Sequence, residues 1–439
     1  MTVNLKDLFR DLDWYIFAAV LVLMIVGIIF IFSSGVSSTG VVISTEYLRQ
    51  IAWVLLGSVL LFIVAMVDHK RVKDLSFILY AALIALLVYT RMFGRVVNGA
   101  RSWIGVGELG IQPSEFAKVA TIFYLSRFLE GTRHTMPGFR RLLGTLVIAG
   151  VPMFLVLSQP DFGTALVFLP ILFTMAYLCG IERRYLVFLG SVVTLTFLLV
   201  VLPIWEKSIA TGSMGMLPML YEGAYFFVIL GVCAVTISLA VWGYLSSRRR
   251  YYYWIAYAFL VILVSLVLSG LGRAILKDYQ IMRLIVFLDP AVDPRGSGWN
   301  IMQSITAIGS GGLTGRGFLR GTQGQYRFLP QQSTDFIFSI LSEEWGFIGG
   351  LLVFSLYGVI LFRTLALLNT VKDPFAVGLL AGLTGMMFFH FMVNVGMTMG
   401  IMPITGIPLF FLSYGGSSLW SVLVGIGLIL GISARRFQS

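Results

Sequence analysis

The chain has 439 residues, of which 58% are hydrophobic and only 12% are charged, and its formal net charge is +11. Soluble globular domains carry about twice this charged fraction, so the composition excludes a soluble fold, a disordered chain and a collagen-like chain. Only two cysteines, Cys179 and Cys233, are present, and both lie in apolar runs, which excludes a disulfide-rich scaffold. The composition therefore predicts an all-α polytopic membrane protein.

Long apolar segments divide the chain into predicted membrane-spanning helices, each needing about 20 predominantly apolar residues. The first follows Lys6 and Arg10 and is too long for the apolar region of a cleavable signal peptide, so we expect it to remain as a membrane helix. A re-entrant arrangement is an alternative for the fifth and sixth segments, which a short polar connection separates. The twelve segments are residues 14–34, 48–67, 75–91, 113–129, 142–158, 164–180, 185–203, 222–246, 252–271, 335–362, 374–398 and 408–433.

Lysine and arginine are distributed unevenly between the predicted connections. With the N-terminus inside and twelve spans, 18 of the 31 cationic residues fall on the inner side and 12 on the outer side, seven of them in residues 272–334. Short outer connections of membrane proteins carry few cations. The pattern predicts that both termini are cytoplasmic and that residues 272–334 form one long extracellular loop. No soluble segment or run of charge indicates a nucleic-acid partner.

Cationic residues nevertheless gather at two outer places. The connection 91–112 carries Arg101, close to Trp103, and the long loop carries others, including Lys277 and Arg295. Contact with lipid headgroups is one explanation, since long basic side chains extend to the membrane surface. The other explanation, which we favour for the group as a whole, is a surface that faces an anionic substrate.

Ionisable residues inside spans are costly and indicate functional sites by default. Glu115 and Lys118 are three residues apart near the start of the span 113–129, so they share a helix face and can form an ion pair. The pair is either purely structural or a carboxylate and an ammonium held near the outer surface for a substrate. Asp161, in the next outer connection, either caps the helix that follows it or orients a substrate hydroxyl or a metal ion.

The long loop contains two Asp-Pro pairs, at Asp289 and Asp293. Proline restricts the residue before it, so both aspartates are expected on a turn-rich segment outside regular helix. The glycine-rich run 309–317 follows, and glycines allow either close approach of the backbone to a ligand or a flexible loop. Asp335 and Glu343 are eight residues apart, slightly over two turns, so we expect them on one helix face with a polar partner for Glu343.

The chain has only three histidines, so a zinc site is not expected, and His390 is interpreted as a hydrogen-bonding partner within its span. No phosphate-binding sequence of the Walker A type occurs, so ATP hydrolysis is not expected. With the spans assigned in this way, the polar groups gather on the outer side of the membrane instead of being distributed through its depth. They favour chemistry or binding at the outer leaflet.

Several segments together resemble the SEDS (shape, elongation, division, sporulation) family of membrane peptidoglycan polymerases, which includes RodA, FtsW and SpoVE. Gly321-Thr322-Gln323 is more similar to the RodA branch. The other matching segments are Gln112-Pro113-Ser114-Glu115-Phe116, Gln159-Pro160-Asp161, Asp293-Pro294, Ile308-Gly309-Ser310-Gly311-Gly312-Leu313, Phe328-Leu329-Pro330, Thr334-Asp335-Phe336-Ile337-Phe338, Thr405-Gly406-Ile407-Pro408-Leu409 and Phe411-Leu412-Ser413-Tyr414-Gly415-Gly416-Ser417-Ser418.

The resemblance implies a SEDS-type helical bundle with ten spans, so the surplus pair of helices within residues 204–271 is interpreted as an insertion. It also implies a single membrane domain in the bacterial cytoplasmic membrane with its active site facing outside. Lipid II is the expected substrate, and a class B penicillin-binding protein, which crosslinks the strands, is the expected partner. Nothing in the sequence marks the contact surface for that partner.

The family reaction requires a base for the acceptor hydroxyl and positive charge for the departing undecaprenyl diphosphate. The family-matching Asp293 is the expected catalytic base, with Asp289 as its competitor. We expect the remaining substrate-binding residues to be Arg101, Trp103, Glu115, Lys118, Asp161, Gln303 and Ser304. No cofactor is required, although a divalent cation, Mg²⁺ or Mn²⁺, could assist. The alternatives are a flippase or transporter of a lipid-linked precursor and a noncatalytic scaffold.

Overall fold

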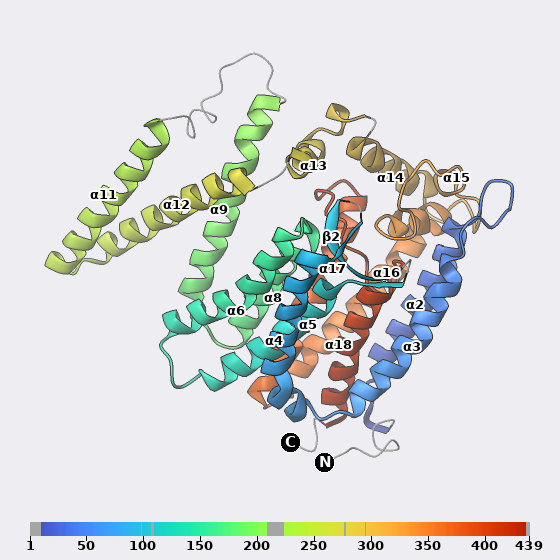
Figure 1. The fold of residues 1–439 in the computed structure, drawn as a ribbon, viewed down its shortest axis with the longest axis horizontal. Helices are drawn as coiled ribbons and strands as arrows, with labels where there is room; N and C mark the ends of the chain where they lie inside the picture. The colour runs from blue at the N-terminus through green and yellow to red at the C-terminus, as the bar shows by residue number, and fades with distance from the viewer. Residues whose placement is uncertain are drawn as a thin grey trace. The chain divides into compact units, whose positions relative to one another are not determined.

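The computed structural model describes residues 10–97, 99–106, 109–208, 224–275, 278–294 and 296–435 (Figure 1). The cationic residues Lys277 and Arg295 of the long loop lie outside the described residues. The chain divides into two compact units, of which the first is Met1–Ile181 with Asn300–Ser439 and the second is Glu182–Trp299.

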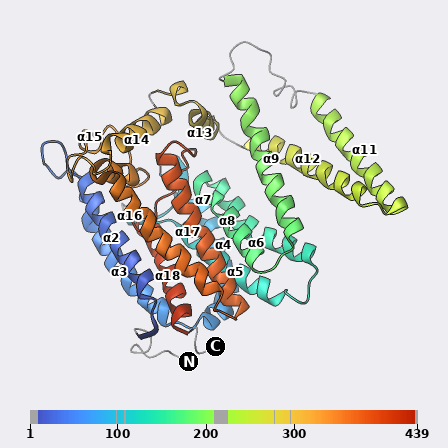
Figure 2. The ribbon, with the colours of Figure 1, turned by 180° about the vertical axis from the view of Figure 1, so that it is seen from behind.

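The first unit is a helical bundle built around α17 and α18, whose residues are mostly buried. Helix α3 packs against α18 on one side, while α5 and α8 pack against α17 on the other, and α16 packs against both α2 and α17 (Figure 2). The helices are α2 (Trp14–Ser34), α3 (Glu46–Met66), α4 (His69–Phe93), α5 (Pro113–Gly131), α6 (Gly138–Ser158), α7 (Phe162–Leu166), α8 (Phe168–Leu178), α14 (Ser297–Gly311), α15 (Thr322–Gln325), α16 (Ile337–Leu368), α17 (Pro374–Thr398) and α18 (Gly416–Arg435).

The second unit contains the helix pair that the sequence analysis interpreted as an insertion. Helix α12 (Arg250–Ile275) packs against α11 (Ala224–Ser247) and also against α9 (Arg183–Ser208). The chain then continues through α13 (Asp278–Leu288), which contacts α9, into the short 3-10 helix η1 (Pro290–Val292).

Ten helices in the described residues are long and apolar enough to cross a membrane. They include α2, whose bounds are those of the first predicted span. The other two predicted spans are also helical, but α5 carries buried charges and the run Phe162–Leu178 is shorter than a usual span. The prediction of a polytopic helical membrane protein is therefore confirmed at about ten spans, whereas an orientation of the termini and of the long loop stays a prediction.

A small antiparallel sheet corrects the expectation of an all-helical chain. It has the order β1 (Arg95–Val97), β2 (Ala100–Val106) and β3 (Leu109–Ile111), directly before α5. The short connection between spans folds this way because Val96, Val97, Ile104 and Ile111 supply β-branched residues that favour pleated strands.

Two helix starts also differ from the prediction. Helix α16 begins at Ile337, so Asp335 lies before the helix and the expected shared face with Glu343 is wrong. Helix α18 begins at Gly416, because the preceding segment is held in a non-helical conformation, in which Leu409 N donates to Ser413 Oγ at 2.9 Å.

Ion pairs and capped helix ends gather at one end of the first unit, which we call the charged end. Asp13 Oδ2 lies 2.8 Å from Arg363 Nη2, and His69 Nε2 lies 2.8 Å from Asp373 Oδ2. Arg435 donates to the last carbonyls of α3, so it stabilises the negative end of that helix. These residues sit at the helix ends that the sequence analysis assigned to the inner side.

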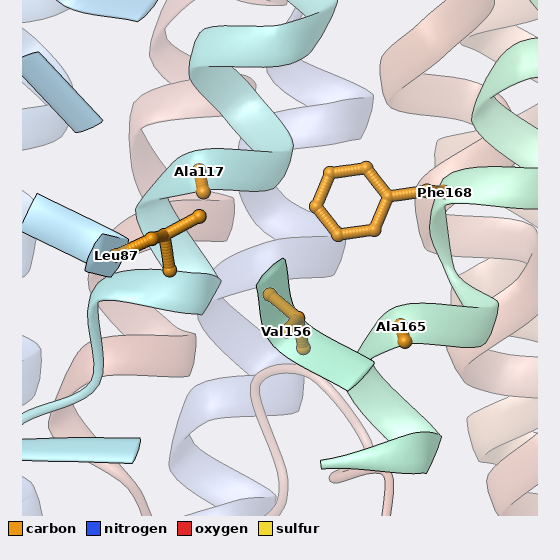
Figure 3. Close-up of a cluster of buried hydrophobic side chains, with 5 residues drawn as sticks. All are labelled: Leu87, Ala117, Val156, Ala165 and Phe168. Carbon is orange, nitrogen blue, oxygen red and sulfur yellow. The ribbon is translucent and has the colours of Figure 1, made fainter. Parts of the chain in front are cut away.

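A buried apolar cluster lies beside the first turns of α5 (Figure 3). One side chain from each of α4, α5, α6, α7 and α8 contributes to it, so the cluster fixes the start of α5 next to the short helix α7. Its members are Leu87, Ala117, Val156, Ala165 and Phe168.

Candidate functional site

A buried network joins α5 to α17 at the end of the bundle opposite the charged end, which we call the loop end. Lys118 Nζ donates to Glu115 Oε1 at 2.8 Å, so the predicted ion pair forms. The same ammonium lies 3.0 Å from Nε2 of His390. Lys118 is fully buried and Glu115 is 2% exposed.

The hydrogen bonds fix the tautomer of His390. Its Nδ1 lies 3.0 Å from the carbonyl oxygen of Pro408, which can only accept, so Nδ1 carries the proton. Nε2 is then unprotonated and accepts from Lys118. The ring also stacks on Phe410, with ring centroids 3.8 Å apart. The prediction that His390 is a hydrogen-bonding partner is confirmed.

The other oxygen of Glu115 reaches α18, where it lies 3.4 Å from Ser421 Oγ, whose hydroxyl also contacts the carbonyl oxygen of Ser418 at 2.9 Å. Sequence analysis missed Ser421 and Phe410, because they meet α5 only through packing of distant segments. Glu115 and Ser421 are 306 residues apart in the chain. The network thus ties α5, α17 and α18 together around one buried positive charge.

Asp161 caps the short helix that follows it, as one of its two alternatives predicts. Its Oδ1 accepts from Thr164 N at 3.2 Å and caps α7, while its Oδ2 accepts from Gln112 Nε2 at 2.7 Å. Desolvation raises the pKa of the Asp161 carboxyl, and the hydrogen bonds from Thr164 oppose that shift. The cap is confirmed, and a substrate role stays a prediction.

Gln112 connects this carboxylate to the start of α18, since its backbone N–H donates to Ser417 Oγ at 3.0 Å. On the other side, Gln159 Nε2 donates to the carbonyl oxygen of Leu87 at 2.9 Å and ties the α6–α7 connection to α4. Glu115 and Lys118 act electrostatically on Asp161. The structure therefore brings three of the predicted site residues into one constellation.

The segment between α17 and α18 contacts this constellation through Pro408 and Phe410, which meet His390. Asn394 Nδ2 donates to the carbonyl oxygens of Asp335 and Ile407, at 3.0 and 2.8 Å. A Cβ on Gly163 would lie 2.2 Å from the carbonyl oxygen of Thr405, so only glycine allows α7 to approach so closely. The segment is therefore a fixed part of the loop end.

Asp293 and Asp289 belong to the second unit, which we describe by itself. Asp293 Oδ2 accepts from Ser297 N at 2.9 Å, and Asp289 Oδ1 accepts from Ala291 N at 2.9 Å. Each aspartate thus caps the short turn or helix that follows it, as expected for a turn-rich segment. Both side chains are partly exposed.

Arg101 and Trp103 lie two residues apart on β2. Arg101 is exposed and its guanidinium donates to the carbonyl oxygen of Met92 at 3.3 Å. The ring of Trp103 packs against Gly110 of β3, where a Cβ would approach the ring to 2.8 Å. The sheet therefore gives the two side chains a fixed support.

Gln303 and Ser304 lie on α14. Ser304 is fully buried and its hydroxyl contacts Ser339 Oγ and the carbonyl oxygen of Thr398, both at 2.6 Å. It joins α14 to α16 and α17. Gln303 is partly exposed, so of the two it is the one whose side chain reaches the surface.

The glycine-rich run lies close to the protein's own backbone. The sequence analysis expected either close approach to a ligand or a flexible loop. A Cβ on Gly315 would lie 2.0 Å from the carbonyl oxygen of Glu344. Glu343 finds the polar partners that the sequence analysis expected. Glu343 Oε1 accepts from Thr322 Oγ1 and from Gln323 N, each at 3.0 Å. The run therefore packs on α16.

The carboxylates of the constellation contact donors of the protein itself. Both oxygens of Glu115 and both oxygens of Asp161 already accept hydrogen bonds. Within the described residues, no group of three or more His, Cys, Asp or Glu side chains could hold a metal ion. No reaction step is therefore assigned to a metal here.

Comparison with known proteins identifies the family of the chain. The chain matches the FTSW_RODA_SPOVE family (Cell cycle protein) over residues 13–212 and 224–438, ranges that include α11 and α12. Peptidoglycan glycosyltransferase RodA of Treponema pallidum is 51% identical over 428 residues, which cover 97% of this chain and 98% of that protein.

Solved structures match the fold over nearly the whole chain. Rod shape determining protein RodA of Thermus thermophilus is 26% identical, with a TM-score of 0.60 and 98% of each chain covered. A chain of a peptidoglycan synthase complex that coordinates polymerization and crosslinking is 27% identical, with a TM-score of 0.67, and 98% of this chain and 99% of that one are covered. The chain is a multi-pass membrane protein that belongs to the FtsW/RodA/SpoVE family, the SEDS family.

Proposed function

We propose that this protein is a peptidoglycan glycosyltransferase that polymerises lipid II into glycan strands for cell elongation and shape. The observation that carries the proposal is the identity of 51%, over 97% of this chain, with the RodA of Treponema pallidum, which is named for that activity. The proposed place of the reaction is the outer leaflet of the bacterial cytoplasmic membrane, where the loop end faces outside.

Asp293 is the proposed catalytic base. Its carboxylate accepts the proton of the C4 hydroxyl of the acceptor N-acetylglucosamine while that oxygen bonds to the anomeric carbon of the donor N-acetylmuramic acid. The bond to undecaprenyl diphosphate breaks, and inversion converts the α linkage into a β-1,4 bond. The hydrogen bond from Ser297 N orients one carboxylate oxygen on a turn, as the bond from Ala291 N does for Asp289, so the choice of Asp293 rests on the family resemblance.

The departing diphosphate needs positive charge. Arg101 is exposed on β2, and we assign it the first contact with this group. Lys118 uses two of its three N–H donors on Glu115 and His390, so one donor remains for the same group. Trp103 supplies an aromatic face for a sugar or the lipid, and Asp161, Glu115, Gln303 and Ser304 complete the proposed substrate contacts.

A class B penicillin-binding protein is the proposed partner. The support is the structural match to a chain of a peptidoglycan synthase complex that coordinates polymerization and crosslinking. A transpeptidase acting on the same strands would use the product of this reaction directly.

The test is strand synthesis from lipid II by the purified full chain, alone and with the penicillin-binding partner. Asp293→Asn and Asp289→Asn form a matched pair, because each aspartate accepts one backbone N–H at 2.9 Å and asparagine retains an oxygen that accepts it. We expect Asp293→Asn to abolish polymerisation and Asp289→Asn to retain it.

Full activity of Asp293→Asn would reject the assignment of the base. Translocation of lipid II across a vesicle membrane without strand synthesis would favour the flippase instead. No activity of the wild type in either assay, but binding of the partner, would favour the scaffold.

A further inference from the structure

The turn between α11 and α12 in the second unit presents exposed arginines that the proposed reaction does not use. Helix α11 ends at Ser247 and α12 begins at Arg250, so only Arg248 and Arg249 connect them. Arg248 has a φ of 52°, and its backbone N–H donates to the carbonyl oxygen of Tyr244 at 2.9 Å, which closes the end of α11. The tight turn therefore gathers three consecutive arginines at one end of the helix pair.

The start of α9 brings two more arginines to this end of the second unit. Tyr257 Oη of α12 donates to the carbonyl oxygen of Arg184 at 3.3 Å, so the first turn of α9 lies beside the beginning of α12. Arg183 and Arg184 are exposed. Among the described residues of the second unit, Glu182 is the one carboxylate near these arginines, and its Oε2 lies 2.7 Å from Arg184 Nε. Five arginines thus meet one carboxylate, and we call this place the arginine end.

Three of the five guanidinium groups have no acceptor in the protein. Within the described residues, the side chains of Arg183, Arg248 and Arg250 form no ion pair and no hydrogen bond. By contrast, Arg363 pairs with a carboxylate, and Arg435 donates to the carbonyls that end α3. A guanidinium group presents several N–H donors in one plane and binds a phosphate with paired hydrogen bonds. The arginine end therefore has donors for an anion from outside the chain.

Exposed tryptophans and tyrosines surround the arginine end. Trp242 lies in the last two turns of α11 and Trp254 in the first two turns of α12, and both are exposed. The ring centroid of Tyr253 lies 5.5 Å from that of Trp254 and 6.3 Å from that of Tyr257, so the aromatic surface continues toward α9. Tryptophan and tyrosine side chains concentrate at the interface between a membrane and water. The rings thus place the arginines at the depth of the lipid phosphates.

We propose that the arginine end binds the phosphate groups of anionic phospholipids, such as phosphatidylglycerol, through Arg183, Arg248 and Arg250. Basic residues next to a membrane helix attract anionic lipids, and the neighbouring rings would pack on the upper part of the acyl chains. The bound lipids would hold the helix pair α11–α12 at a fixed depth. This site needs neither lipid II nor polymerisation, so it is independent of the proposed function.

Positive charge on one side of a membrane protein can also have the sole effect of setting its orientation. The α5–α6 connection offers a comparison within the same chain, because Arg133 and Arg140 are exposed there without a tyrosine or tryptophan between them. If orientation were the only role, the two places would attract anionic lipids equally. The proposed site requires charge and aromatic rings together and therefore predicts a difference.

The experiment measures which lipid lies next to a chosen residue of the full-length protein in nanodiscs. With Cys179 and Cys233 replaced by alanine, a fluorophore is attached to Ser246→Cys, exposed beside the turn, or to His134→Cys, in the α5–α6 connection. A nitroxide near the headgroup of phosphatidylglycerol or of phosphatidylcholine quenches the fluorophore. The quenching gives the association constant of each lipid at that residue.

Two pairs of substitutions remove matched numbers of exposed arginines. Arg248→Gln with Arg250→Gln removes two cations from the arginine end, and Arg133→Gln with Arg140→Gln removes two from the α5–α6 connection as a control. Arg248→Lys with Arg250→Lys keeps the charge, so it also keeps the charge distribution that orients the helices.

At residue 246 we expect phosphatidylglycerol to associate at least about tenfold more tightly than phosphatidylcholine, because each basic residue near an anionic lipid contributes roughly a fivefold gain. The glutamine pair at positions 248 and 250 should lose this preference, whereas the lysine pair and the control pair should retain most of it. At residue 134 the preference should be clearly weaker.

Equal association of the two lipids at residue 246 would overturn the proposal. So would an equal preference at residues 134 and 246, because positive charge alone would then explain it. A preference that survives in the glutamine pair, or that the lysine pair loses as fully as the glutamine pair does, would show that the phosphates do not bind to these cations. Neither lipid carries a glycan, so these outcomes do not depend on whether the protein polymerises lipid II.

Discussion

Lys118 keeps a full positive charge inside the bundle because a carboxylate and an imidazole lone pair accept its protons. Removing one member of such a buried pair costs about 3–5 kcal/mol, since the other charge remains uncompensated. We expect Lys118→Met to lower the thermal unfolding temperature in detergent strongly. The double variant that also carries Glu115→Gln should recover most of this loss. Equal stability of Lys118→Met and the wild type would contradict the network.

Asp161 offers a way to separate a helix cap from a substrate contact. Asp161→Ala should cost about 0.5–2 kcal/mol, the usual loss of an N-cap, whereas asparagine still accepts from Thr164 N. We expect Asp161→Asn to be at least as stable as the wild type at pH 7, because it does not bury a charge. We expect it to polymerise lipid II at least about tenfold more slowly, because a charged hydrogen bond is lost. Normal polymerisation by Asp161→Asn would leave Asp161 as a cap only.

The pH dependence of Asp161 has a definite sign. Desolvation raises its pKa, so the folded protein binds this proton more tightly than the unfolded chain does. The contribution of Asp161 to stability therefore falls as pH rises from its usual value of 3.8 through the raised pKa. The asparagine of Asp161→Asn cannot ionise. The free energy of unfolding of this variant, measured at several pH values, should therefore not show this decline.

Helix α16 is interrupted at Gly346, whose φ of 63° and ψ of −157° are essentially restricted to glycine. A Cβ there would lie 2.3 Å from Gly315 N. Gly346→Ala should therefore lower the unfolding free energy by about 1–3 kcal/mol and release the glycine-rich run. Gly350→Ala, in the same helix with only an ordinary contact to Phe338, should be neutral or slightly stabilising. Equal effects of the two changes would reject this explanation of the kink.

Elements whose pattern is local were predictable. The apolar run 14–34 became α2 with the same bounds, and the spacing of Glu115 and Lys118 gave their ion pair. Contacts between distant segments were not predictable. Lys118 and His390 are 272 residues apart, and no periodicity relates them. The sheet was missed because a connection of 22 residues between spans was treated as a loop, although it contains runs of β-branched residues.

For the molecule as a whole, the family resemblance predicted the function, which the spacing of residues alone did not predict. The motifs identified the family, which end-to-end similarity then confirmed. The role of Asp293 follows from the motif resemblance and stays a prediction. The structure divides Asp293 and the buried constellation between two units. The insertion of α11 and α12 stays a prediction.

The orientation of the bundle decides whether the loop end can meet lipid II at the outer leaflet. Ser38, in the α2–α3 connection, and His134, in the α5–α6 connection, are both exposed and lie at opposite ends of the first unit. After Cys179 and Cys233 are replaced by alanine, we expect a membrane-impermeant maleimide to label Ser38→Cys in intact cells. His134→Cys should be labelled only after permeabilisation, because its connection carries the cations that mark the inner side. The reverse pattern would place the loop end in the cytoplasm, where the proposed polymerisation of lipid II on the outer leaflet could not occur.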